Sequence, residues 1–136
     1  MATGTAQGIL FRVLGIPGSL RKASFNLGLL RAAQTVAPTG VDISICDIRR
    51  IPFYGRDMEA GGDPRPVVDL KDAIRQSDGL LFATPGVQNW GTSGALKKAI
   101  DWASRDKGEG SFMGKPATIV GAGGRSGTAG ARVKLQ

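Results

Sequence analysis

Short apolar runs alternate along this chain with segments in which apolar residues recur every three or four positions. The runs occupy 9–16, 41–46, 79–84 and 116–122. The first is nearly continuous, which is typical of a parallel strand covered on both faces of its sheet. The second alternates apolar and polar residues, which is typical of an edge strand. Four strands are therefore predicted.

Helical spacing follows each of the first three runs. Apolar residues share one helical face after Ser24, after Pro66 and over 95–103. Loops are predicted at 51–55 and 61–64, where Gly and Pro gather. A fourth helix is expected to begin in the last residues. Alternation of strands with helices predicts one α/β domain over residues 1–136, a three-layer α/β/α sandwich around a parallel sheet.

Parallel sheets of this kind bind ligands at the carboxyl ends of their strands. The first strand is followed by the loop 18–26, in which four side chains offer hydroxyl, guanidinium and amide groups: Ser19, Arg21, Ser24 and Asn26. Backbone N–H groups at the start of a helix, aided by such donors, bind phosphate well. The other interpretation is that Ser24 is a plain helix N-cap and Arg21 a solvated surface charge.

Two further loops follow strands and carry suitable chemistry. Residues 85–94 are polar apart from Trp90 and a few small or apolar residues. In one interpretation they line the flat ring of a ligand, and in the other they form a plain surface loop with Trp90 packed against the protein. Residues 121–130 are glycine-rich, which permits close backbone approach to a ligand or simply a flexible connection. Neither the dinucleotide pattern G-x-G-x-x-G nor the Walker pattern is present.

Composition narrows the classes of function. The chain has 136 residues, 41% hydrophobic and 21% charged, as in an ordinary globular domain. Its net charge of +7 attracts anions. The sequence contains no run of five basic residues and no basic stripe. The expected partners are therefore anionic small molecules rather than nucleic acid.

The absence of histidine and the single cysteine exclude several kinds of site. They rule out an internal disulfide and catalysis by a histidine base. A structural zinc site is not expected either, because the chain offers only one Cys and no His as ligands. Cys46 is predicted to be a small buried residue. One cysteine favours a reducing, cytoplasmic location. No membrane span and no secretory signal is expected, because no sufficiently long apolar stretch and no basic start before an apolar core is present.

Several motifs, taken in order, resemble the NADPH-dependent FMN reductase family. They are the 18–26 loop, Pro52-Phe53-Tyr54, the run 81–85, Ser93-Gly94-Ala95-Leu96-Lys97-Lys98-Ala99-Ile100-Asp101-Trp102, and Gly114-Lys115-Pro116. The similarity spans about residues 9 to 136. It implies a flavodoxin-like sheet of strand order 2-1-3-4 and a homo-oligomer.

The resemblance also implies a cofactor and its binding residues. FMN would be held by residues of all three loops: Ser19, Arg21, Ser24, Asn26, Pro85, Gln88, Asn89, Trp90, Gly123, Arg125 and Gly127. NADPH or NADH would reduce the flavin, which would pass electrons to a small acceptor such as a quinone, free flavin or chromate. The flavin carries the redox chemistry, so neither a catalytic side chain nor a metal is expected.

Two departures from the family pattern keep a second hypothesis open. The 85–94 loop lacks the family's Glu and Tyr, and the family's fifth strand and last helix are missing, so a C-terminally incomplete domain is expected. An uncovered apolar face and a bare sheet edge should follow. The alternative function is therefore a non-catalytic flavodoxin-like fragment or assembly module, with weak or no flavin binding.

Overall fold

The computed structural model describes residues 10–18, 25–84, 94–105 and 110–121. Its elements, in chain order, are β1 (Phe11–Pro17), α2 (Phe25–Val36), β2 (Val41–Ile45), α3 (Arg56–Ala60), α4 (Arg65–Gln76), β3 (Gly79–Ala83), α5 (Gly94–Ala103) and β4 (Ala117–Val120). The four strands form one parallel sheet in the order β2-β1-β3-β4. The predicted topology is confirmed, and no fifth strand lies among the described residues.

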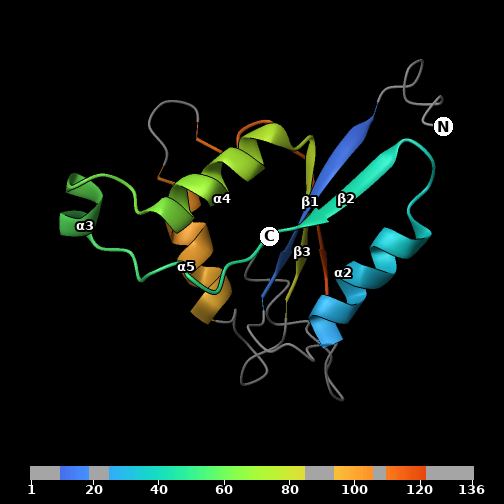
Figure 1. Cartoon of the computed structure of the whole chain (residues 1–136), viewed down its shortest axis with the longest axis horizontal. Coiled ribbons are helices and arrows are strands. Elements are labelled where there is room, and N and C mark those ends of the chain that lie inside the picture. The colour runs from blue at the N-terminus through green and yellow to red at the C-terminus, as the bar shows by residue number, and fades with distance from the viewer. Residues whose placement is uncertain (1–9, 19–24, 85–93, 106–109, 122–136) are drawn as a thin grey trace.

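Helices cover both faces of the sheet (Figure 1). α2 lies against one face, and α4 and α5 lie against the other. Leu14 and Leu80 are register partners in β1 and β3, and both are buried against α4 and α5. We call this side the α4–α5 face. The opposite side, which carries Val13, Gly15 and Leu81, is the α2 face.

The α4–α5 face holds the main core. Trp102, Ile74 and Leu96 are fully buried there, together with Ile16 and Val67. α4 packs on this face through Val67, Leu70 and Ile74. Pro66 does not interrupt the helix, because it lies in the first turn, where its missing N–H costs no helical hydrogen bond. This face therefore behaves as an ordinary protein interior.

The α2 face is only partly covered. An open groove of about 300 Å³ runs over the amino ends of the strands, and it is lined by Phe11, Val13, Ile43, Gly79, Leu80, Leu81, Pro116, Ala117 and Thr118. We call it the sheet groove. Phe11 is 40% exposed beside it. The prediction that the first strand is covered on both faces is therefore wrong for its first residues, because α2 crosses only the later part of β1.

Two other predictions need correction. The segment between 55 and 61 contains the short helix α3, which the sequence analysis did not predict because five residues carry too little periodicity. Cys46 is partly rather than fully buried, since it follows the edge strand β2 and packs against the margin of the core.

Candidate functional site

The carboxyl ends of the four strands form one continuous, hydrogen-bonded edge. Cys46 N–H donates to Gly15 O at 2.9 Å, and Gly18 N–H donates to Ala83 O at 2.7 Å. Thr84 N–H donates to Val120 O at 2.9 Å. The ladder thus continues to the point where each predicted ligand loop begins. A ligand bound here would rest on a rigid platform.

Close packing of α2 on β1 sets the start of that helix at this edge. Gly15 makes the approach possible, because a Cβ on it would meet Leu30 Cδ2 at 3.2 Å and Ser44 O at 3.3 Å. Leu30 is fully buried as a result. The first turn of α2 therefore follows the 18–24 loop at the carboxyl end of β1, where the partial positive charge of a helix N-terminus favours an anion.

Asn26 is the one predicted cofactor-binding residue that the structure describes. It lies in the first turn of α2 and is only 4% exposed. The others lie outside the described residues: Ser19, Arg21, Ser24, Pro85, Gln88, Asn89, Trp90, Gly123, Arg125 and Gly127. What the structure brings together is the set of strand ends from which all three loops leave.

The end of β2 carries an ion pair at this side of the sheet. The Arg49 guanidinium donates to Asp47 Oδ1 at 3.0 Å and to Asp47 Oδ2 at 2.7 Å, and these hydrogen bonds lower the pKa of Asp47 to about 2. Burial raises the pKa of the neighbouring Cys46 thiol to about 12, aided by the negative charge of Asp47. Cys46 is therefore an inert thiol at neutral pH rather than a nucleophile.

The segment after β2 is fastened to the C-terminal half of α5. Trp102 Nε1 donates to Pro52 O at 2.9 Å, and the Tyr54 ring meets the Trp102 ring edge-on with centroids 5.2 Å apart. Tyr54 Oη donates to Glu59 Oε2 at 2.5 Å. This hydrogen bond is the main cause of a raised Tyr54 pKa and a lowered Glu59 pKa.

Arg105 completes this cluster from the end of α5. Its guanidinium lies 4.6 Å from the Tyr54 ring centroid and 3.4 Å from Glu59 Oε1. Nearby, the buried Lys71 ammonium bonds Asp63 Oδ2 at 2.6 Å, which ties α4 to the loop after α3. We call Pro52, Tyr54, Glu59, Trp102 and Arg105 the α5 clamp. Sequence reasoning gave these residues no role beyond the place of Pro52 and Tyr54 in the motif 52–54 and of Trp102 in the motif 93–102.

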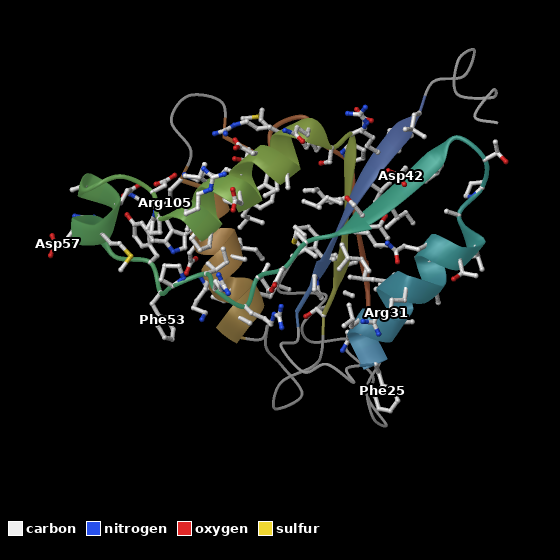
Figure 2. All side chains as sticks on the ribbon, in the orientation of Figure 1. Phe25, Arg31, Asp42, Phe53, Asp57 and Arg105 are labelled. Carbon is white, nitrogen blue, oxygen red and sulfur yellow. The ribbon has the colours of Figure 1, made fainter. Side chains whose placement is uncertain are left out.

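Phe53 lies inside the clamped segment yet points into solvent (Figure 2). It is 77% exposed, and Lys98 Nζ lies 4.8 Å from its ring centroid. Lys98 comes one helical turn after the start of α5. No sequence signal distinguished this pair, because the contact joins residues 45 positions apart.

Metal and membrane features were also sought in the described part of the chain. It contains no group of three or more His, Cys, Asp or Glu placed to hold a metal ion. Nor does any helix in those ranges have the length and apolar character that a bilayer crossing requires.

Comparison with known proteins identifies related sequences. The family model for NADPH-dependent FMN reductases matches residues 11–136. The chain is 48% identical over 126 residues to an NAD(P)H-dependent FMN reductase of Pseudomonas aeruginosa, covering 92% of this chain and 67% of that protein. It is 42% identical over 119 residues to an NAD(P)H:quinone oxidoreductase of Solanum tuberosum, covering 85% of this chain and 60% of the relative.

A solved structure supports the same grouping. The flavoenzyme NAD(P)H:(acceptor) oxidoreductase FerB of Paracoccus denitrificans superposes with a TM-score of 0.85 at 37% identity. The match covers 93% of this chain and 69% of FerB. The chain therefore spans about three fifths to two thirds of the length of the proteins it resembles.

Proposed function

Because this chain belongs to the NADPH-dependent FMN reductase family, we propose that it binds FMN at the carboxyl edge of its sheet and acts as an NAD(P)H-dependent oxidoreductase. The observation that carries the proposal is the hydrogen-bonded edge itself, from which the three predicted loops leave. Relatives named as FMN reductases and quinone oxidoreductases support the reaction class.

The groups at this edge suit the phosphate of FMN. α2 begins there, so its N-terminal dipole favours an anion. Asn26 places an amide in its first turn, and the sequence supplies Ser19, Arg21 and Ser24 just before it. Hydroxyl, amide and guanidinium donors around a helix N-terminus match the acceptor oxygens of a phosphate.

FMN, if bound there, would supply the redox chemistry, namely hydride transfer from NAD(P)H and electron transfer to a small acceptor such as a quinone, free flavin or chromate. The protein binds and orients. Ser19, Arg21, Ser24 and Asn26 are proposed to hold the phosphate. Pro85, Gln88, Asn89 and Trp90 are proposed to lie along the ring, and Gly123, Arg125 and Gly127 to close over it.

Retention of flavin tests the binding proposal directly. Purified protein is mixed with FMN and desalted, and the absorbance spectrum gives the FMN content per chain. About one FMN per chain is expected, together with NADPH oxidation in the presence of a quinone above the rate of free FMN. The double variant Ser19→Ala, Arg21→Ala should lose most of the flavin, whereas Arg65→Ala, which removes the same charge from the exposed start of α4, should keep it. Equal retention by both variants would refute the phosphate assignment.

The alternative function, a non-catalytic assembly module, is favoured by one observation. The sheet groove leaves apolar surface open on the α2 face. A folded protein that retains no FMN and oxidises NADPH no faster than free flavin would establish this alternative. Self-association, which the family resemblance implies, is tested in the same preparation by light scattering.

A further inference from the structure

The α5 clamp fixes the backbone on both sides of Phe53. The Pro52 carbonyl accepts a hydrogen bond from Trp102, which is fully buried, and Tyr54 is held by Trp102, Glu59 and Arg105. Phe53, between these two anchored residues, is nevertheless 77% exposed. The Phe53 side chain is therefore exposed although its backbone is firmly held in place. A ring held in place before a ligand arrives loses little freedom on binding, so it can bind at a low cost in ordering entropy.

One face of the Phe53 ring is occupied by a cation. Lys98 Nζ lies 4.8 Å from the ring centroid. The adjacent Lys97 is different, since its ammonium pairs with Asp101 Oδ1 at 2.5 Å. No carboxylate among the described residues forms an ion pair with Lys98. A positive charge beside an exposed aromatic face is thus available to an incoming ligand.

The position of this pair connects it with the carboxyl edge. α5 starts at Gly94, directly after the loop that follows β3, and Lys98 is about 6 Å further along the helix axis, at about 1.5 Å per residue. In Figure 2, Phe53 points to the side of the molecule on which the strands end. A ligand too long for the FMN site alone would extend over this surface.

We infer that Phe53 and Lys98 form a shelf for the adenosine phosphate half of NAD(P)H, an inference that rests on the proposed function. The adenine ring stacks on the open face of Phe53, and the ammonium of Lys98 contacts a phosphate of the same ligand. The ligand must combine a flat aromatic ring with negative charge, because the shelf combines a phenyl face with a cation that pairs with no carboxylate in the described ranges. A neutral quinone could stack on Phe53 but carries no negative charge for Lys98.

The test uses adenosine 2′,5′-bisphosphate, which contains the adenine and phosphates but no nicotinamide. It is titrated calorimetrically into the chain with and without added FMN. Phe53→Ala should weaken binding about tenfold, because stacking of a base on an aromatic ring is lost. Lys98→Gln should weaken it about threefold at low salt and less at high salt. Phe53→Trp should restore affinity to at least that of the unmodified chain.

Two matched controls separate the shelf from general effects. Lys97→Gln removes the same charge one residue away, from a lysine that does not face Phe53, and should leave the affinity within twofold. Val36→Ala trims another exposed apolar side chain, 77% exposed at the end of α2, with the same expected lack of effect. In the flavin-loaded protein, Phe53→Ala should raise KM for NADPH by the same factor as it weakens the bisphosphate.

The outcomes keep this inference apart from the proposed function. If the unmodified chain does not bind the bisphosphate, or if Phe53→Ala binds it as tightly as the unmodified chain does, the shelf is overturned even if FMN is retained. Failure to retain FMN, with bisphosphate binding that still depends on Phe53, would overturn the proposed reductase and leave the shelf standing. A change in oligomeric mass in Phe53→Ala without any change in affinity would assign Phe53 to a subunit interface instead.

Discussion

The two faces of the sheet are built from the same four strands and differ in what covers them. On the α4–α5 face, Leu14, Leu80, Ile74 and Trp102 are at most 4% exposed. On the α2 face, the single helix α2 contacts β1, β2 and β3, and the sheet groove remains open beside it. Parallel strands are apolar on both sides, so an uncovered face costs stability that a covered face does not.

The difference shows which parts of the molecule are held rigidly by packing. The closed face anchors α5 and, through the α5 clamp, the segment that presents Phe53. The open face still fixes the start of α2, because Leu30 packs into the space above Gly15. Both faces thus support the carboxyl edge, while the sheet groove runs over the amino ends and the middle of the strands. The site and the sheet groove lie at opposite ends of the sheet.

Adjacent leucines of β3 provide the strongest test of this comparison. Leu80 lies in the core of the closed face and is 4% exposed, whereas Leu81 lines the groove and is half-buried. Leu80→Ala should lower the free energy of unfolding by about 3 kcal/mol, since it leaves a cavity. Leu81→Ala should lower it by about 1 kcal/mol, because less apolar surface is lost from burial. Urea unfolding followed by circular dichroism measures both, and equal losses would mean that the groove is covered in solution.

Alkylation of Cys46 tests how well the closed face excludes water at its margin. Its pKa of about 12 keeps the thiol protonated at pH 8, so iodoacetamide should react at least about a hundredfold more slowly than with the urea-unfolded chain. The raised pKa also means that the thiol's contribution to stability is complete below pH 9 and is lost as the pH rises towards 12. Mass spectrometry measures the rate for this single cysteine, and equal rates in the two states would contradict its burial.

Two glycines test the packing of α2. Gly15→Ala should lower the free energy of unfolding by about 1–2 kcal/mol, because the new Cβ would press on Leu30 and the Ser44 carbonyl. Gly28→Ala, inside α2 with no atom within 4 Å of the added Cβ, should raise it by about 0.5–1 kcal/mol. Thermal unfolding of the two variants gives the comparison. A neutral Gly15→Ala would mean that α2 can move away from β1 at little cost.

The smallest effect is expected from the ion pair after β2, which belongs to neither core. Asp47→Asn should change the free energy of unfolding by less than about 0.5 kcal/mol, because both partners are largely exposed. The lowered pKa of Asp47 places its contribution above about pH 4 and removes it as the pH falls towards 2. Urea unfolding at pH 7 and pH 3 checks this, and a large loss at pH 7 would show that the pair has a structural role.

Sequence periodicity predicted most of the fold because each long element carries its own pattern. The nearly continuous run in β1, the alternation in β2 and the helical spacing around Leu70 and Ile74 each reflect local geometry. The short helix α3 escaped prediction because five residues complete little more than one turn. For the candidate site, the sequence identified the loops by residue type, and the structure adds buried Asn26 and the bonded strand ends.

The sequence by itself determined the alternation of strands and helices, the likeness to the FMN reductases and the exclusion of histidine chemistry, since these depend on residue identity and near neighbours. Tertiary structure alone decided where on the sheet the open groove lies and that Phe53 contacts Lys98. Such features depend on how distant segments meet. The Trp102 bond to Pro52 joins residues 50 positions apart, and no local pattern encodes which carbonyl an indole N–H will reach.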